Sequence, residues 1–301
     1  MSGFKIWDLE IEDKKRVRFI INPISGIGRK NKIQAQIEKY LNHTKFDYDI
    51  VYTEGPKHAT ELSKEASDLG FDVVVAVGGD GSAHEVGCAL IGTETALAII
   101  PAGSGNGLAR YLKLPLNHKK AIQRINDYNV KRIDTGVINN DVFLSTTGMG
   151  FDAFIAWKFA LFGPRGLFSY VWLIFQEYFR YKPKEYKIEI NGEVIETKAF
   201  VVICGNSNQW GNNAIIAPGA EIDDGILDLA VCKPFPFYAV FVMASLLFAG
   251  SVEESPYMDI YRGSEMKITQ TTVLAHVDGE PVRLGRELNI SVNPKSLNVL
   301  V

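Results

Sequence analysis

The 301-residue sequence predicts an α/β protein with two domains: a doubly wound N-terminal domain and a C-terminal domain that is mostly antiparallel β-sheet. Two patterns support this prediction. Between residues 16 and 132, short continuous apolar runs alternate with segments of helical periodicity, which is typical of a parallel sheet covered on both faces. After residue 134, strand-like runs follow one another with Asn-Gly and Asp-Gly turn pairs, which favours antiparallel strands. We therefore divide the chain into residues 1–133 and 134–295.

In the N-terminal domain the pattern predicts four strands, each followed by a helix. The strands are "VRFIIN" (17–22), "YDIVYT" (48–53), "VVVAV" (73–77) and "ALAII" (96–100). The helices are "NKIQAQIEKYL" (31–41), "ATELSKEASDL" (59–69), "AHEVGCALI" (83–91) and "LARYL" (108–112). In the C-terminal domain, strand-like runs such as "YKIEIN" (186–191) and "ILDLAVC" (226–232) are interrupted by two helical segments, 151–179 and 237–249.

Composition excludes several classes of protein. A net charge of −3 leaves no basic surplus, so nucleic acid is not expected to be the main partner. The cysteines Cys88, Cys204 and Cys232 are far apart, which predicts neither a zinc site nor a disulfide framework and favours a reducing compartment. The N-terminus lacks the apolar core of a signal peptide, so we expect a cytoplasmic protein. The longest uncharged apolar stretch, 235–249, is shorter than the about 20 residues of a membrane-spanning helix and predicts a buried helix.

Glycine-rich loops follow three of the predicted parallel strands. They are "NPISG" (22–26), "GGDG" (78–81) and "GSGNG" (103–107). In an open parallel sheet, ligands bind outside the carboxyl ends of the strands, so we expect the loops to converge there. Bare backbone N–H groups at a helix N-terminus bind phosphate well. Asp80 lies inside the second loop, and a carboxylate beside a polyphosphate requires either Mg²⁺ or a structural hydrogen bond.

Other phosphate-binding motifs are weaker. No Walker A sequence is present, which excludes P-loop chemistry. A single dinucleotide-type match, "GMGFDA" (148–153), falls in the strand-rich half and lacks the acidic residue expected to follow it, so an oxidoreductase ranks last among the interpretations.

At these residues the sequence resembles the diacylglycerol kinase catalytic-domain family, which includes bacterial lipid kinases, sphingosine kinases and ceramide kinases. The matching segments occur in family order and span nearly the whole chain. They are "NPISG" (22–26), Thr53 with "HATELSKEA" (58–66), "GGDGSAHEV" (78–86), "PAGSGNGLA" (101–109), "DTG" (134–136), "GFDA" (150–153), "DDGILDL" (223–229) and "VDGEP" (277–281).

The resemblance implies an N-terminal domain like that of NAD kinases and phosphofructokinases, and a C-terminal β-sandwich. It also implies that the last strand, 296–301, returns to the N-terminal domain. The implied activity is transfer of the γ-phosphate of ATP to a lipid hydroxyl, with Mg²⁺. The resemblance and the glycine loops together predict a set of nucleotide-binding residues. They are Asn22, Ser25, Gly26, Thr53, Gly78, Gly79, Gly81, Ser82, Glu85, Gly103, Ser104, Gly105 and Asn106.

Asp278 is the candidate general base, because a carboxylate can take the proton of an alcohol late in phosphoryl transfer. The alternative is that "DGEP" is only a hairpin turn. Glu280, two residues after Asp278, is predicted to point the same way and to reach Mg²⁺. The resemblance implies that Asp80 and Asp134 are further acidic residues of the site.

Two further sites are left open. Arg165 is either a phosphate clamp or a solvated loop charge. "DDGILDL" could hold a second cation through Asp224 and the carbonyls of Glu221 and Ile226, or form an ordinary turn. His84 and His276 are interpreted as a hydrogen-bonded helix residue and a packed strand residue.

The sequence departs from the family pattern at two positions, and in bacterial members these positions supply side chains to a magnesium-binding network. Gly107 follows Asn106 where many bacterial members carry Asp, and Ile27 stands where Lys is common.

A lipid acceptor needs an apolar slot, for which 151–179 and the helix from Phe237 are candidates, although core helices could look the same. We expect a lipid substrate and brief docking to a bilayer surface, with a homodimer left open. The competing functions are phosphorylation of a soluble nucleotide, as in NAD kinases, and a non-enzymatic sensor.

Overall fold

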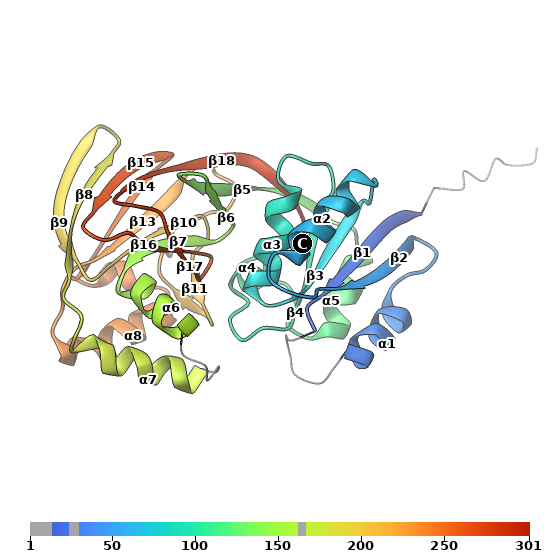
Figure 1. Ribbon diagram of the computed structural model, residues 1–301, viewed down its shortest axis with the longest axis horizontal. Coiled ribbons are helices and arrows are strands. Elements are labelled where there is room, and N and C mark those ends of the chain that lie inside the picture. Colours follow the sequence, from blue (N-terminus) through green and yellow to red (C-terminus); the bar gives the residue numbers. More distant parts are fainter. Residues whose placement is uncertain (1–13, 24–29, 162–166) are drawn as a thin grey trace, which may run out of the picture.

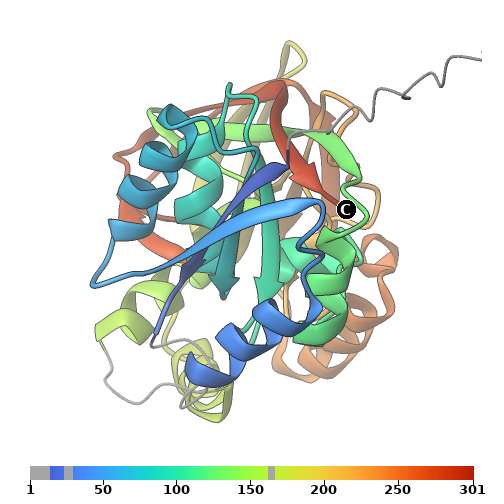
Figure 2. The ribbon, with the colours of Figure 1, turned by 90° about the vertical axis from the view of Figure 1, so that its right-hand side faces the viewer.

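A computed structural model describes residues 14–23, 30–161 and 167–301. Its N-terminal domain is a parallel sheet with the strand order β2-β1-β3-β4. The elements are β1 (Lys15–Ile21), α1 (Lys30–Tyr40), β2 (Phe46–Tyr52), α2 (His58–Asp68), β3 (Val73–Gly78), α3 (Asp80–Leu90), β4 (Ala96–Pro101), α4 (Gly107–Tyr111) and α5 (His118–Ile125). Figure 2 shows this sheet with helices on both of its faces.

Alternate residues of the buried strands explain why both faces are covered. Val73, Val75 and Val77 of β3 belong to a core cluster that includes residues of α1 and α5. Val74 and Ala76 of the same strand belong to a second cluster with residues of α2, α3 and α4. A strand that is apolar at every position therefore has a core on each side, as the continuous apolar runs predicted. The predicted doubly wound domain is confirmed.

The C-terminal domain is built from antiparallel strands in two layers. Its elements are β5 (Val130–Ile138), β6 (Asp141–Phe143), β7 (Thr146–Gly150), α6 (Phe151–Leu161), α7 (Leu167–Tyr178), β8 (Lys184–Ile190), β9 (Glu193–Ala199), β10 (Val201–Gly205), β11 (Gln209–Gly211), β12 (Ala214–Ile215), β13 (Leu227–Cys232), η1 (Phe237–Ala239), α8 (Val240–Ala249), η2 (Val252–Glu254), β14 (Met258–Gly263), β15 (Glu265–Gln270), β16 (Leu274–Val277), β17 (Glu280–Arg283) and β18 (Glu287–Leu300). One layer has the strand order β14-β13-β10-β7-β16-β17, and the other contains β18-β15-β8-β9. A buried cluster with residues from both layers, among them Met149 and Ile188, forms the core between them.

The long strand β18 connects the two domains (Figure 1). Its first part pairs with β15, where Ile290 lies opposite Met266, and its last part pairs in parallel with β4, where Val299 lies beside Leu97. The last residues of the chain therefore extend the N-terminal sheet.

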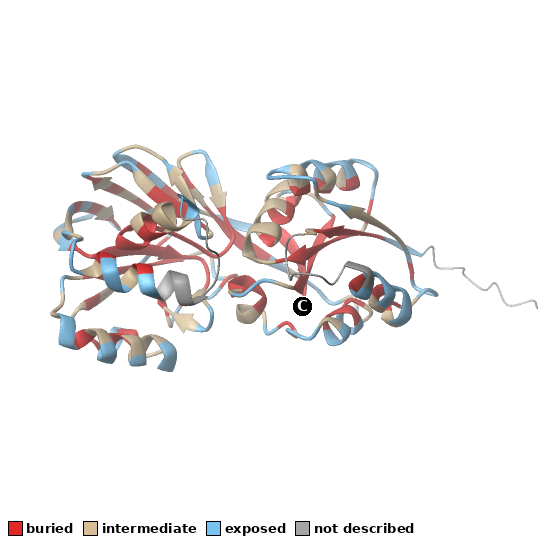
Figure 3. Ribbon diagram, turned by 60° about the horizontal axis from the view of Figure 1, so that its bottom comes forward, coloured by how far each residue is buried: buried red, intermediate tan, exposed pale blue. Residues whose placement is uncertain are grey.

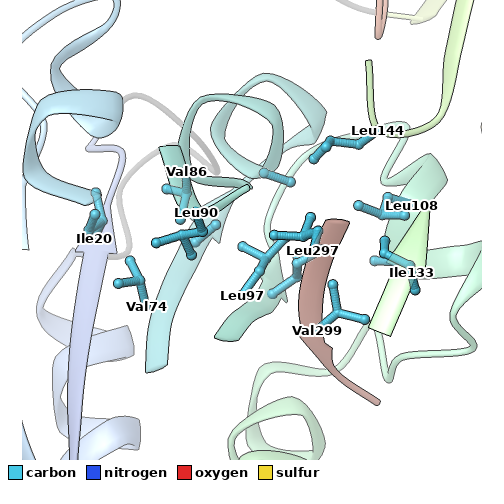
Figure 4. Close-up of a cluster of buried hydrophobic side chains, with 14 of the residues drawn as sticks. Ile20, Val74, Val86, Leu90, Leu97, Leu108, Ile133, Leu144, Leu297 and Val299 are labelled. Atoms are coloured by element: carbon cyan, nitrogen blue, oxygen red, sulfur yellow. The ribbon is translucent and has the colours of Figure 1, made fainter. Parts of the chain in front are cut away.

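A buried apolar cluster also crosses from one domain to the other (Figure 4). It joins Val86 and Leu90 of α3 to Leu144, which follows β6, and to Leu297 of β18. Gly87 makes this contact possible, since a Cβ atom built there would lie 2.6 Å from Cδ1 of Leu144. Helix α3 is thus packed directly against the C-terminal domain, and Leu144 is fixed beside it.

The predicted helical segments are each divided. Segment 151–179 forms α6 and α7, and segment 237–249 forms the short 3-10 helix η1 followed by α8. The prediction that this second segment is a buried helix is wrong, because Met243 is the one buried residue of α8 and Phe241, Val242 and Phe248 are exposed. Among the helices of residues 14–23, 30–161 and 167–301, none has the length and apolar character needed to cross a bilayer.

Candidate active site

Two of the three glycine loops are in direct contact. Gly78 and Pro101 are paired at the ends of β3 and β4, and the loops continue from there. A Cβ atom built at Gly103 would lie 2.5 Å from Cα of Gly79, so the two backbones approach as closely as glycine allows. Asn22, where the first loop begins, lies beside β3, because its amide donates to the carbonyl of Val77 at 3.1 Å. Ser25 and Gly26 lie outside the described residues.

Asp80 ties the second loop to the third. Its carboxylate accepts the backbone N–H groups of Asn106 at 2.8 Å and Gly107 at 2.6 Å. Gly105 leaves room for this carboxylate, since a Cβ atom there would lie 2.6 Å from Oδ2 of Asp80. Burial raises the pKa of Asp80 above its usual 3.8, against the lowering effect of the two amides, and the nearby charge of Asp278 raises it further. Of the two roles predicted for Asp80, Mg²⁺ binding or a structural hydrogen bond, the structure shows the hydrogen bond.

Asn106 shapes the third loop from within. Its backbone is left-handed with φ of 53°, and its side chain accepts from the amide of Gly103 at 3.0 Å and donates to the carbonyl of the same residue at 2.8 Å. The side chain is almost fully buried in this arrangement. Ser104, at the tip of the loop, is exposed. Asn106 thus holds the loop, while Ser104 is accessible.

Three predicted nucleotide-binding residues support neighbouring elements. Glu85 accepts the backbone N–H groups of Lys57 at 3.0 Å and Ala59 at 3.3 Å, and so holds the N-terminus of α2. Thr53 donates its amide to the carbonyl of Ile21 at 3.0 Å. Ser82 in the first turn of α3 lies with its Oγ atom 3.4 Å from Nδ2 of Asn22.

Asp278 lies in a tight turn between β16 and β17. Val277 pairs with Glu280, so the turn has two residues, and both Asp278 and Gly279 have positive φ, at 47° and 85°. These angles are typical of the type I′ hairpin turn, for which Asp-Gly is a preferred sequence. The backbone of "DGEP" is therefore a hairpin turn, as one of the two interpretations predicted.

The side chain of Asp278 crosses to the N-terminal domain. Its Oδ2 atom lies 2.8 Å from Nδ1 of His84 on α3. Its carboxylate also accepts three backbone N–H groups, from Leu144 at 2.8 Å, Ser145 at 2.8 Å and Thr146 at 3.0 Å. Only 5% of the side chain is exposed. Four donors therefore surround a buried carboxylate at the interface between the domains.

The charges of this pair reinforce one another. Burial opposes the charged form of His84, but the hydrogen bond to Asp278, the contact with Cys88 and the charge of Asp278 together outweigh burial and raise the pKa of His84 from 6.5 to about 11. Burial would likewise raise the pKa of Asp278, but His84 and the backbone amides lower it below its usual 3.8. The pair is therefore an imidazolium and a carboxylate near neutral pH.

Glu280 lies over the second glycine loop. It is exposed, and a Cβ atom built at Gly81 would lie 3.3 Å from Oε1 of Glu280. Asp278 and Glu280, two residues apart, therefore both reach the first turns of α3. Asp80, His84, Asp278 and Glu280 form the candidate active site.

Asn206 supports this site, although no pattern in the sequence indicated it. Its Nδ2 atom donates to the carbonyls of Asp134 and Leu144, both at 2.8 Å, and its amide donates to the carbonyl of Ser145 at 2.8 Å. The carbonyls of Leu144 and Ser145 are thus held by Asn206 while their amides hold Asp278. Such contacts join residues far apart in sequence, so local motifs do not reveal them.

The other predicted acidic residues have structural partners. Asp134 is fully buried and accepts the amides of Gly225 and Lys295, both at 2.7 Å. Asp224 accepts the amide of Ile226 at 3.0 Å and pairs with Arg262 at 2.6 Å. Glu221 is exposed and Arg165 lies outside the described residues. In the part of the chain that the structure describes, no three His, Cys, Asp or Glu side chains are grouped as metal ligands.

Comparison with protein families gives two matches that follow one another along the chain. Residues 16–138 match the diacylglycerol kinase catalytic domain, and residues 146–301 match the YegS C-terminal NAD kinase beta sandwich-like domain. The second match alone covers more than half of the 301 residues.

Individual relatives cover nearly the whole chain. A diacylglycerol kinase of Mycobacterium tuberculosis is 27% identical over 293 residues, which is 95% of this chain and 94% of the relative. A probable YegS-like lipid kinase of Pseudomonas aeruginosa is 29% identical over 252 residues, 80% of each chain. The solved structure of a putative diacylglycerol kinase from Bacillus anthracis superimposes with a TM-score of 0.80 at 24% identity, over 96% of this chain and 97% of that one. This last likeness shows the fold.

Proposed function

Since the chain belongs to the diacylglycerol kinase catalytic-domain family, we propose that it is an ATP-dependent lipid kinase that transfers the γ-phosphate of ATP to a lipid hydroxyl. The acceptor would be a lipid such as diacylglycerol or a sphingoid base. The observation that carries the proposal is the position of Asp278 and Glu280. Both extend from the C-terminal domain to the first turns of α3, which begins at the second glycine loop.

The glycine loops fit a triphosphate. Their closest approach, between Gly79 and Gly103, leaves no space for side chains, so bare backbone faces the ends of β3 and β4. Strand β3 pairs with β1 on one side and with β4 on the other, and the strand order reverses between β1 and β3, which is the usual ligand position in open parallel sheets. In this proposal the phosphates contact the loops at 78–81 and 103–106, with Ser82 and Ser104 as hydroxyl donors.

Asp80 and Glu280 are the residues that would hold Mg²⁺. A carboxylate has about four lone-pair positions, so Asp80 keeps acceptor capacity after binding the two amides of the third loop. Glu280 is exposed and lies over Gly81. Mg²⁺ bound there would neutralise charge on the transferring phosphate. Asp134 would not bind Mg²⁺ itself in this proposal. It would support the site through its backbone carbonyl, which accepts from Nδ2 of Asn206.

Asp278 would take the proton of the acceptor hydroxyl. A carboxylate with a low pKa suits this role when the proton leaves late, because the alcohol oxygen becomes acidic only as it bonds to phosphorus. The four donors around Asp278 fill its lone-pair positions, so the hydroxyl has to replace one of them. His84 is the only one of the four that is a side chain. We propose that the acceptor hydroxyl replaces His84 as the hydrogen-bond donor to Oδ2 of Asp278.

The lipid would reach this site from the side of the domain that carries α7, η1 and α8. Figure 3 shows exposed residues along these helices, and they include large apolar side chains. We define the apolar helix surface as Trp172, Phe175, Phe179, Phe237, Tyr238, Phe241, Val242 and Phe248. Phe179 packs against Phe237 with ring centroids 4.8 Å apart, so the apolar parts of α7 and η1 are continuous.

A bilayer is the partner that fits this surface. Phe241 and Tyr238 are 74% and 76% exposed, which is unusual for rings that face only water. Arg180 and Lys182 follow α7 directly and are exposed, which favours a membrane with anionic lipids. Apolar rings beside basic side chains are typical of proteins that dock on a membrane surface without crossing it.

The test is to incubate the full chain with Mg²⁺ and radiolabelled ATP, in parallel with total lipid extract in vesicles and with NAD, and to identify labelled products by mass spectrometry. We expect label in a lipid extractable into organic solvent. Label in NAD would instead support the soluble-nucleotide alternative. If neither acceptor is labelled although ATP binds, the chain is a sensor and the proposed activity is wrong.

A further inference from the structure

A second buried acid–histidine pair lies beside the Asp278 turn, within the C-terminal domain. Nε2 of His276 lies 2.7 Å from Oδ2 of Asp152, and each side chain is only 4% exposed. Asp152 is in the first turn of α6 and also accepts the amide of Ala153 at 2.7 Å. His276 is in β16, two residues before Asp278. The pair thus links α6 to the strand that leads into the candidate active site.

The other nitrogen of His276 contacts the turn itself. Nδ1 lies 3.3 Å from the amide of Gly279 and can only accept from it, so the ring proton is on Nε2 and is donated to Asp152. The carbonyl of His276 accepts from Oγ1 of Thr147 at 2.7 Å. His276 is therefore held at both ring nitrogens and at its backbone. Through Gly279 it fixes a turn in which both residues have positive φ.

Gly148 provides the space for this arrangement. It pairs with His276 across β7 and β16. A Cβ atom built at Gly148 would lie 2.4 Å from Oδ2 of Asp152 and 2.5 Å from Nε2 of His276. A side chain at this position would separate the pair. The backbone of β7 thus leaves room for a buried contact between Asp152 and His276. This contact explains the first glycine of "GMGFDA", Gly148, and no bound dinucleotide is needed to explain it.

We propose that Asp152 and His276 are positioning residues for phosphoryl transfer. The chain of contacts runs from Asp152 through His276 to the amide of Gly279, and it fixes the turn that directs the carboxylate of Asp278 toward His84 and α3. Neither residue touches the reacting groups in this proposal. Its kinetic part depends on the proposed lipid kinase activity, whereas its structural part, the fixed orientation of Asp278, does not.

The kinetic test compares Asp152→Ala with the isosteric Asp152→Asn. Alanine removes the acceptor for Nε2–H, whereas asparagine keeps an oxygen there. We expect Asp152→Ala to lower kcat about tenfold or more with the KM for ATP within about twofold, because small displacements of a reacting group are costly. Asp152→Asn should keep kcat within about threefold, because its oxygen still accepts the ring proton.

The matched control is Asp259→Ala. It removes the ion pair between Asp259 and Lys233, whose atoms are 2.7 Å apart, in the same domain. We expect this variant to keep the kcat of the unchanged chain. If it loses as much kcat as Asp152→Ala, or if Asp152→Ala keeps full kcat while folded by circular dichroism, the proposal is overturned.

The structural test needs no activity. The imidazole N–H signals of His84 are recorded by ¹⁵N NMR in the full chain and in each variant. We expect the Nδ1–H signal of His84 to be retained in Asp152→Asn and to broaden or shift in Asp152→Ala, because His276 then no longer fixes the turn that orients Asp278. His276→Gln is measured instead if Asp152→Ala does not fold, with the same expectation. An unchanged His84 signal would refute the positioning role, even if the chain phosphorylates no lipid.

Discussion

Nδ1 of His84 lies 2.8 Å from Oδ2 of Asp278, and this contact joins helix α3 of the N-terminal domain to a hairpin turn 194 residues later in the chain. It brings a carboxylate of the second domain to the helix that begins at the glycine loop. Because Asp278 also accepts three backbone amides, its orientation is fixed from both domains.

The first prediction concerns Asp278→Asn. The amide keeps the size of the side chain but cannot accept a proton from the lipid hydroxyl. We expect kcat for lipid phosphorylation to fall about 10²- to 10⁴-fold, the usual contribution of a positioned base. The measurement is steady-state turnover with radiolabelled ATP. Retention of turnover near that of the unchanged chain would rule out Asp278 as the base.

The second prediction concerns His84→Ala. Because the acceptor hydroxyl replaces His84 in the proposed reaction, we expect kcat to stay within about tenfold of the unchanged chain, far above Asp278→Asn. Stability should fall by about 2 kcal/mol, because a buried carboxylate loses the imidazolium that pairs with it. His84→Gln, which keeps an N–H donor, is the control for the hydrogen bond. Loss of turnover as complete as that of Asp278→Asn would contradict the proposed exchange.

The third prediction is the pH dependence of that stability. The pKa of His84 is about 11 in the folded protein against 6.5 ordinarily, so its stabilising effect is complete below pH 6.5 and is lost as pH rises toward 11. The pKa of Asp278 is lowered, so its effect is present above pH 3.8 and is lost in stronger acid. The difference in unfolding free energy between the unchanged chain and His84→Ala should shrink between about pH 6 and pH 10, measured by urea denaturation. A difference that grows with pH would show that the pair is not ionic.

The fourth prediction concerns the contact between the glycine loops. In Gly103→Ala the new methyl group would lie 2.5 Å from Cα of Gly79, which is backbone and cannot turn aside. We expect a stability loss of about 1–3 kcal/mol and a raised KM for ATP. Gly55→Ala is the control, because nothing lies within 4 Å of its built Cβ atom. Equal behaviour of the two variants in thermal unfolding and ATP titration would exclude a tight contact.

The fifth prediction concerns the apolar helix surface. Val242 and Val194 are 58% and 59% exposed, but only Val242 lies on that surface. We expect Val242→Glu to weaken binding to vesicles with anionic lipid about tenfold or more, since on the proposed docking surface it replaces an apolar group with a charge that the bilayer repels. Val194→Glu should bind as the unchanged chain does. Cosedimentation measures both, and equal binding would place the docking surface elsewhere.

The sequence predicted the fold well because its strongest signals are local. Continuous apolar strands and helical periodicity identify the doubly wound domain, and glycines mark where strands end. Short motifs also led to the prediction of Asp80 and Asp278 as site residues, and the structure places Asp80 in the first turn of α3 and Asp278 in contact with His84 of the same helix. The pairing of β18 with β4 was implied only by family resemblance, since a single strand shared by two domains has no local signature.

The partners of the site residues were harder to predict, because they depend on contacts between distant segments. His84 was interpreted as a hydrogen-bonded helix residue and His276 as a packed strand residue, but their partners were not predicted: each lies 2.8 Å or less from a carboxylate more than 100 residues away in the sequence. The amides of Leu144, Ser145 and Thr146 carry no side-chain signal at all. The cation site predicted at Asp224 stays a prediction, and in the structure Arg262 occupies that carboxylate.

A crystal structure of the full chain with Mg²⁺ and a nonhydrolysable ATP analogue tests the central claim most directly. We predict that the triphosphate contacts the backbone at 78–81 and 103–106, with its terminal phosphorus facing the Asp278 turn and Glu280. A triphosphate bound away from these loops, or a terminal phosphorus on the side opposite Asp278, would contradict the account.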